Sequence, residues 1–144
     1  MSEKTEIACR LFNSGFNCAQ AVVGAFSPVE EGQAELVLKL ASSFGGGMRC
    51  GEVCGAVTGA LMVLGLREGQ YVADDLDAKK KSAELTSRFM EEYYSRKGAL
   101  LCRELLGYDI RDPAAKGKSA ASKREVCEDA IKTAILLLEE VGIR

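Results

Sequence analysis

The sequence predicts an all-α protein, a single-domain bundle of about six helices that spans residues 1–144. Apolar residues recur at helical spacing along nearly the whole chain, and no segment shows the alternation of a half-buried strand. Cap residues and glycines divide this pattern into segments of helical length. A chain of 144 residues is also long enough to form one domain with its own hydrophobic core.

Start and stop signals give the expected order of the elements. Ser2 and Asn17 can cap the first two helices, and Asp74 with Asp75 can cap the longest one, which Gly98 ends. Helices are therefore expected over about residues 3–13, 18–26, 30–44, 52–66, 76–96, 99–106 and 122–141, with loops at 45–51 and 109–122.

Charge and hydropathy exclude several classes of function. A net charge of −2 and a pI near 5.3 provide no basic field for nucleic acid. The first ten residues contain no apolar signal segment, which predicts a cytoplasmic protein with reduced thiols. The longest apolar run, residues 53–66, is shorter than the roughly 20 residues that cross a membrane, so we expect a buried helix and no membrane insertion.

The chain has six cysteines and no histidine. Without histidine there is no Cys–His catalytic pair and no usual haem ligand, so we expect no haem and assign any chemistry to sulfur. Four cysteines, Cys18, Cys54, Cys102 and Cys127, fall near expected helix starts, where unpaired N–H groups and the helix dipole favour a thiolate. Cys9 lies in the middle of a helix and is expected to be an inert buried thiol.

The segment from Cys50 to Gly59 carries the most specific pattern. Gly51, Gly55 and Gly59 are four residues apart, so one side of the expected helix is bare backbone, and another helix or a cofactor could approach it closely. We therefore treat Gly55 and Gly59 as candidate cofactor-binding positions. Cys50 and Cys54 are also four apart and would be neighbours if both were helical.

Five segments resemble a known family, the C_GCAxxG_C_C family of redox-active proteins, which is named for four cysteines and a CGAxxG motif. They are Phe16-Asn17-Cys18-Ala19, Phe44-Gly45-Gly46-Gly47, Cys54-Gly55-Ala56-x-x-Gly59, the segment from Cys102 to Gly107, and Cys127. The resemblance spans nearly the whole chain. It implies a small protein whose redox activity depends on Cys18, Cys54, Cys102 and Cys127. A similar domain occurs with certain multihaem cytochromes that also carry an iron–sulfur centre. The resemblance therefore leaves open that this protein binds an iron–sulfur cluster.

Three functions compete at this point. The first is thiol–disulfide redox chemistry, in which Cys54 is the most acidic and attacking thiol and Cys50 or Cys18 resolves the mixed disulfide. The second is a 2Fe–2S cluster or zinc held by Cys18, Cys54, Cys102 and Cys127. The third is a structural bundle whose cysteines only pack. The first two predict that these four sulfurs converge while Cys9 stays apart. The redox partner and a homo-oligomer are left open.

Overall fold

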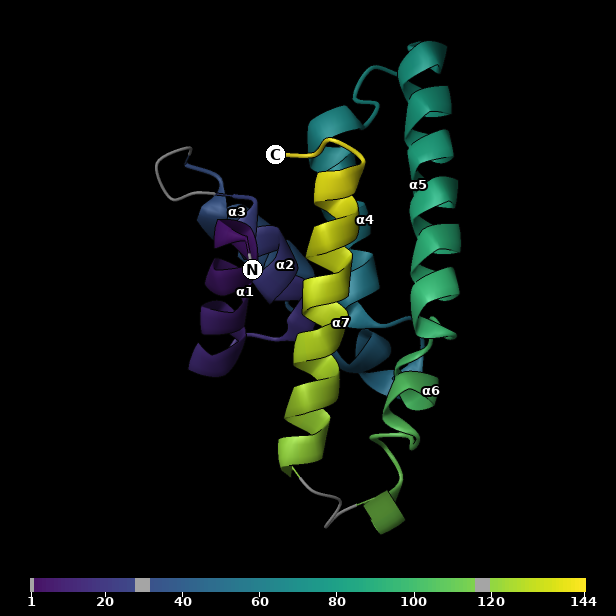
Figure 1. Cartoon of the computed structure of the whole chain (residues 1–144). Helices are drawn as coiled ribbons and strands as arrows, with labels where there is room; N and C mark the ends of the chain where they lie inside the picture. The colour runs from purple at the N-terminus through teal and green to yellow at the C-terminus, as the bar shows by residue number, and fades with distance from the viewer. Residues whose placement is uncertain (1, 28–31, 116–119) are drawn as a thin grey trace.

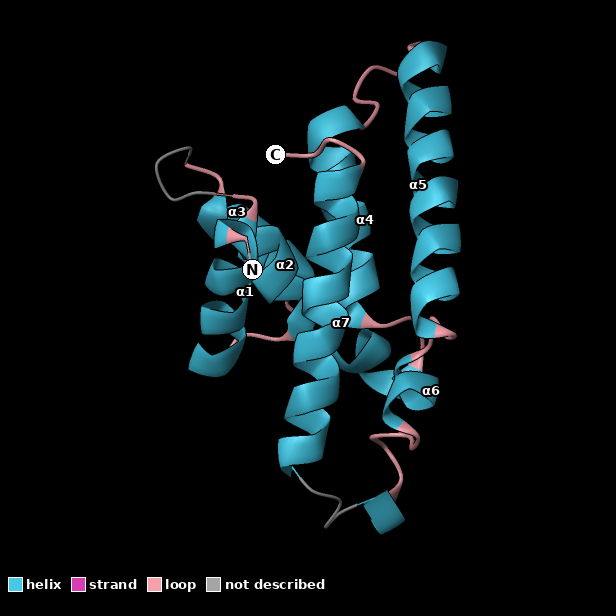
Figure 2. Cartoon of the chain, viewed as in Figure 1, coloured by secondary structure: helices cyan, strands magenta, loops and turns pink. Residues whose placement is uncertain are grey.

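The computed structural model describes residues 2–27, 32–115 and 120–144, except for the side chains of residues 115 and 120–122 (Figure 1). Helices dominate these residues, and no strand is present among them beyond one isolated bridge between Val53 and Leu101 (Figure 2). The all-α class is therefore confirmed. The α-helices number seven in the described part of the chain, which agrees with the seven ranges expected from start and stop signals and exceeds the stated total of about six. They are α1 (Glu3–Ser14), α2 (Cys18–Ala25), α3 (Ala34–Ala41), α4 (Gly55–Glu68), α5 (Leu76–Lys97), α6 (Cys102–Leu106) and α7 (Ala120–Glu140).

The predicted caps are confirmed for three helices. Ser2 Oγ accepts a 3.2 Å hydrogen bond from the backbone N–H of Thr5 at the start of α1. Asn17 and Gln20 form a reciprocal capping box on α2, with distances of 2.8 and 3.0 Å. The Asp75 carboxylate accepts from the backbone of α5. Each cap satisfies backbone donors that the helix leaves unpaired, so the first turns are held in place.

Two helices begin later than predicted, and both shifts have the same cause. The expected starts were Glu52 for α4 and Ala99 for α6, whereas the observed starts are Gly55 and Cys102. The residues just before each start are extended instead and pair with each other across the bridge. Such a short pairing needs no alternating pattern, so helical periodicity cannot reveal it.

The other boundaries differ by a few residues. The third helix ends at Ala41 and not near Phe44, and its predicted opening at Glu30 and Glu31 lies outside the described residues. In the predicted loop at 45–51, residues 47–51 form a π-type turn, η2 (Gly47–Gly51). The second predicted loop contains a short 3₁₀ turn, η3 (Pro113–Ala115). No described helix has both the length and the apolar character needed to cross a membrane.

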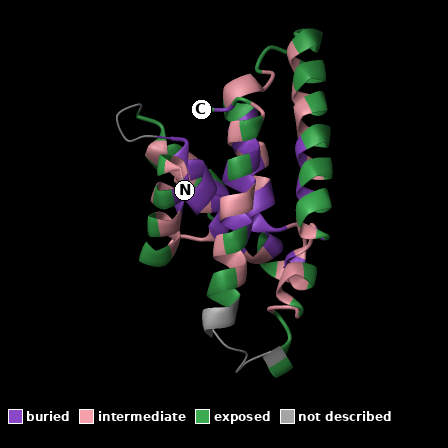
Figure 3. Cartoon of the chain, in the orientation of Figure 1, coloured by how far each residue is buried: buried purple, intermediate pink, exposed green. Residues whose placement is uncertain are grey.

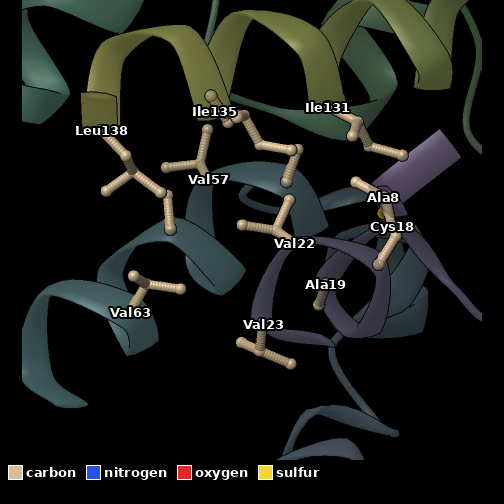
Figure 4. Packing of buried hydrophobic residues seen from close by; sticks show 14 of the residues in the cluster. Ala8, Cys18, Ala19, Val22, Val23, Val57, Val63, Ile131, Ile135 and Leu138 are labelled. Carbon is tan, nitrogen blue, oxygen red and sulfur yellow. The ribbon is translucent and has the colours of Figure 1, made fainter. Parts of the chain in front are cut away.

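The core forms where α2 and α4 cross beneath α7. Val22 of α2, Val57 of α4 and Ile135 of α7 are fully buried, and Figure 4 shows their side chains pointing toward one another. Figure 3 shows that buried residues concentrate on these helices, while α5 presents mainly exposed residues. On α5 only Phe89 and Tyr93 are buried. This long helix is therefore anchored to the core by a narrow aromatic stripe near its C-terminal half.

Candidate functional site

One cavity of about 420 Å³ brings four cysteines together. Cys18, Cys54, Cys102 and Cys127 all line it, whereas Cys9 and Cys50 do not. All six cysteines are free thiols. The rest of the lining consists mainly of apolar side chains and glycine backbone, and includes Phe12, Gly45, Gly46, Leu105, Leu106, Ile110, Val126 and Ala130. A cavity of this size can admit a small molecule to the sulfurs.

Cys18 is the first residue of α2, directly after the Asn17 cap, and is only 7% exposed. Its sulfur lies against Gly55, the residue after Cys54, and hydrogen bonding with the Cys54 side chain is the main reason why the pKa of Cys18 falls to about 7 despite burial. Backbone N–H groups of Gly46, Ala19 and Cys18 lower it further. A large share of Cys18 is therefore thiolate at neutral pH, although the group lies in a largely apolar cavity.

Cys54 occupies the N-cap position of α4 and has the opposite behaviour. Its hydrogen bond to Cys18, its burial and the negative charge on Cys18 raise the pKa of Cys54 well above the ordinary value, and the N–H groups of Ala56 and Val57 offset this only in part. Two sulfurs in contact share one proton because a second thiolate would repel the first. The prediction that Cys54 is the most acidic thiol is therefore wrong: Cys18 holds the negative charge, and Cys54 donates the hydrogen bond.

The glycines of the CGAxxG motif allow this contact. A Cβ atom on Gly55 would overlap Cys18 Sγ and come within 3.0 Å of the Phe44 carbonyl oxygen. On Gly59 it would lie 2.8 Å from the Ala19 carbonyl oxygen. The bare side of α4 is thus occupied by the N-terminal turn of α2. A helix fills the space next to Gly59, whereas Gly55, with a cysteine sulfur beside it, also lines the cavity, so the cofactor-binding role of the two glycines stays a prediction.

Cys50 does not take the position that its spacing suggested. Met48 and Arg49 adopt left-handed backbone angles, with φ of 58° at each, and Cys50 is also non-helical. The Cys50 thiol donates to the Gly47 carbonyl oxygen at 3.4 Å. A helical i,i+4 relationship with Cys54 therefore does not form, and Cys18 takes the place expected for Cys50 as the thiol next to Cys54.

Cys102 and Cys127 complete the sulfur lining as protonated thiols. Burial and the nearby charge of Cys18 raise the pKa of Cys102 to about 11 and that of Cys127 to about 12. The positive charge of Lys123 lowers the pKa of both thiols and offsets these effects in part. Because α7 begins at Ala120, Cys127 lies about two turns into the helix, beyond the unpaired N–H groups that were expected to activate it.

Three further residues near the sulfurs were not identified as functional from the sequence. Arg49 and Lys123 line the cavity, and no aspartate or glutamate does so among the described residues. Tyr93 is fully buried, its hydroxyl has no hydrogen-bond partner among the described residues, and desolvation by burial is the main cause of its raised pKa. Helical periodicity could place Tyr93 on the inner face of α5, but it could not show what the hydroxyl faces.

Cys18, Cys54, Cys102 and Cys127 were also predicted as alternative ligands of a metal or cluster. Within the described part of the chain, no three or more cysteine, aspartate or glutamate side chains are grouped closely enough to hold one metal ion.

The fold and the cavity define a small all-α protein with four cysteines around one opening. A family model described as "Putative redox-active protein (C_GCAxxG_C_C)" matches residues 16–141, and the chain belongs to this family. Neither the curated proteins nor the solved structures contain a significant match. The predicted family membership is therefore confirmed, and the redox label attaches to the family as a whole.

Proposed function

We propose that this protein carries out thiol–disulfide exchange, with Cys18 as the attacking thiolate and Cys54 as the second cysteine. The observation that carries the proposal is that the Cys18 sulfur lies against the start of α4, next to Cys54, and that both cysteines line one open cavity. The lowered pKa of Cys18 supports the assignment, because thiolate and not thiol is the nucleophile. A pKa near the ambient pH also balances thiolate fraction against intrinsic nucleophilicity.

The reaction has two steps. The Cys18 thiolate attacks one sulfur of a substrate disulfide, that S–S bond breaks, and the first substrate thiolate leaves with Cys18 held in a mixed disulfide. Cys54 then loses its proton to the departing thiolate and attacks the Cys18 sulfur. The second substrate sulfur leaves as a thiolate, which takes a proton from solvent, and a Cys18–Cys54 disulfide remains. One substrate disulfide is reduced to two thiols while the protein's dithiol is oxidised, and the reverse sequence oxidises a substrate dithiol.

Cys102 and Cys127 are assigned no role in the first attack. Their pKa values of about 11 and about 12 leave them protonated near neutral pH, and a thiol is a poor nucleophile. Their own negative charge would also be opposed by the thiolate of Cys18. Exchange therefore begins at Cys18 although four sulfurs line the same cavity.

Stoichiometry with a small neutral disulfide tests the proposal. The reduced wild type should release both thiols of hydroxyethyl disulfide. Cys54→Ser should release one and keep the other on Cys18, and Cys18→Ser should be slow at neutral pH. Cys9→Ser is the matched control, since Cys9 lies outside the cavity. If the wild type keeps one substrate thiol bound as a mixed disulfide, the pairing of Cys18 with Cys54 is contradicted. If the purified protein contains iron or zinc, and no cysteine reacts until that metal is removed, metal ligation is favoured instead.

A further inference from the structure

Two positively charged side chains line the cavity that holds the exchange pair. Arg49 and Lys123 both belong to its lining and are exposed to solvent. Neither side chain forms an ion pair or a hydrogen bond with another described residue. By contrast, Arg103, on the nearby helix α6, pairs with the Glu52 carboxylate at 2.9 Å. The charges of Arg49 and Lys123 are therefore available to a molecule that enters the cavity.

The position of Arg49 is maintained in an unfavourable backbone conformation. Its φ of 58° lies in the left-handed region, which arginine rarely occupies. Two hydrogen bonds hold the turn around it. Arg103 donates to the Gly51 carbonyl oxygen at 3.1 Å, and the Glu52 N–H donates to the Gly47 carbonyl oxygen at 3.0 Å. Such strain is typical of functional sites, and here it keeps Arg49 at the cavity.

The depth of the sulfurs limits the size of a substrate. Cys18 and Cys54 line the cavity, yet each is only 7% exposed. A disulfide of a folded protein is flanked by backbone on both sides, and this backbone would have to enter the cavity with it. The cavity measures about 420 Å³, which lies within the range of sites for small molecules. A small disulfide can therefore reach the two sulfurs more easily than a protein disulfide.

We propose that the substrate is a low-molecular-weight disulfide that carries carboxylate groups, and that Arg49 and Lys123 bind these groups. This inference rests on the proposed function and names the substrate class of the same site. A guanidinium group can hold a carboxylate through two parallel hydrogen bonds, and an ammonium group binds one as a point charge. No aspartate or glutamate among the described lining residues competes for the two cations.

Charge balance also favours an anionic substrate. The thiolate of Cys18 repels an anion, but it carries one negative charge and faces a cavity with two positive side chains. During exchange one half of the substrate stays on Cys18 as a mixed disulfide, and the other half leaves as a thiolate. When each half carries a carboxylate, both halves keep a group that the cavity attracts.

Binding can be measured without disulfide chemistry. Adipate has the chain length of dithiodiglycolate, with two methylene groups in place of the two sulfurs, so it can fill the site but cannot react. If its Kd is about 1 mM, adipate at about 10 mM should slow alkylation of Cys18 by neutral iodoacetamide about tenfold. Hexanediol, the uncharged analogue, should not slow it when the ionic strength is kept constant.

Variants assign this protection to the two cations. Arg49→Gln combined with Lys123→Gln should abolish protection by adipate, whereas Arg49→Lys, which keeps the charge, should retain most of it. Lys79→Gln combined with Arg88→Gln is the matched control, because it removes one lysine and one arginine from α5, outside the cavity. Equal effects of adipate and hexanediol on the wild type, or equal losses of protection in both double variants, would overturn the carboxylate site.

Exchange rates test the substrate class. Each rate is divided by the rate of the same disulfide with mercaptoethanol. At low salt dithiodiglycolate should then oxidise Cys18 about tenfold faster than hydroxyethyl disulfide, and folded insulin should be slower than either. Insulin that reacts as fast as dithiodiglycolate would overturn the small-molecule class. If no disulfide forms between Cys18 and Cys54 with any of them, the proposed function fails, and protection by adipate still decides whether the cavity binds carboxylates.

Discussion

The backbone N–H of Cys54 donates a 2.8 Å hydrogen bond to the carbonyl oxygen of Leu100, a residue 46 positions further along the chain. The reciprocal bond, from the Cys102 N–H to the Glu52 carbonyl oxygen, measures 2.6 Å. Together they form the bridge that ends just before α4 and α6. This pairing brings together the two segments that carry Cys54 and Cys102, and both cysteines line the cavity.

The acidity of Cys18 should depend on the Cys54 thiol. Alkylation of wild-type Cys18 should rise with pH to a midpoint near 7, because the thiolate reacts and its pKa is about 7. Cys54→Ala removes the main cause of that low value and should move the midpoint upward by about one to two units. Peptide mapping after timed alkylation gives the midpoint for each thiol.

Two comparisons complete this test. Cys54→Ser keeps a hydroxyl donor and should shift the midpoint less than Cys54→Ala, while Cys9→Ala should not shift it. An unchanged midpoint in Cys54→Ala would show that the backbone N–H groups alone set the acidity of Cys18.

Gly59 should be required for the close crossing of α2 and α4. In Gly59→Ala the new methyl group would lie 2.8 Å from the Ala19 carbonyl oxygen and 3.2 Å from Val22 Cβ, so the helices must separate. We expect a loss of about 1–3 kcal/mol in the free energy of unfolding and slower exchange at Cys18. Urea unfolding and the disulfide reduction assay measure the two effects.

Gly65 provides the matched control on the same helix. A Cβ atom there would meet nothing within 4 Å, so Gly65→Ala should raise the free energy of unfolding by about 0.5–1 kcal/mol through helix propensity. Destabilisation of similar size at both positions would argue against the specific crossing.

The Asn17 cap should matter for both stability and reactivity. Asn17→Ala removes the capping box and the 3.0 Å hydrogen bond from the Asn17 side-chain amide to the Ser42 carbonyl oxygen, and should cost about 1 kcal/mol or more. It should also raise the pKa of Cys18, because fraying of the first turn weakens the bond from the Ala19 N–H. Ser2→Ala, which removes the cap of α1, should reduce stability and leave Cys18 unaffected.

Arg49 and Lys123 should make the cavity selective for negatively charged disulfides. Both line the cavity, and no acidic side chain joins them among the described residues. At low salt an anionic aromatic disulfide should react with Cys18 about tenfold faster than the cationic cystamine. Each rate is first divided by the rate of the same disulfide with a free thiol, which corrects for intrinsic reactivity. The combined change of Arg49→Gln and Lys123→Gln should reduce this ratio, as should added salt.

Lys79→Gln removes a positive charge from α5 and tests whether the net charge of the protein alone accounts for the preference for anionic disulfides. The assignment to the cavity would be contradicted if this variant reduced the preference as much as the change at Arg49 and Lys123.

Some of the helix starts could be predicted from the sequence, and the features that could not be predicted have physical causes. Asn17 and Asp75 carry local cap signals, so the starts of α2 and α5 could be predicted. The acidity of Cys18 could not, because it depends on a tertiary contact with Cys54 and on which of the two sulfurs keeps the shared proton. The left-handed turn at Arg49 likewise lacks a local signal, since arginine rarely adopts such angles.

The conformation of η2 also depends on residues that are distant in the sequence. Arg103 donates hydrogen bonds to the Gly51 carbonyl oxygen at 3.1 Å and to the Glu52 carboxylate at 2.9 Å, and so holds the turn from the side of α6. Helical periodicity describes one element at a time. It therefore predicts which face of a helix is buried, but not the contacts between elements that keep Cys50 out of the helix that follows Cys54.

Mapping the first disulfide that forms tests the central claim most directly. Reduced protein would be treated with a limited amount of a small disulfide, quenched with acid, alkylated and digested, and its cross-linked peptides identified by mass spectrometry. The contact between the two thiols predicts that Cys18–Cys54 is the dominant cross-link, with Cys50, Cys102 and Cys127 still alkylated. A dominant Cys50–Cys54 or Cys102–Cys127 cross-link, or none at all, would contradict the account.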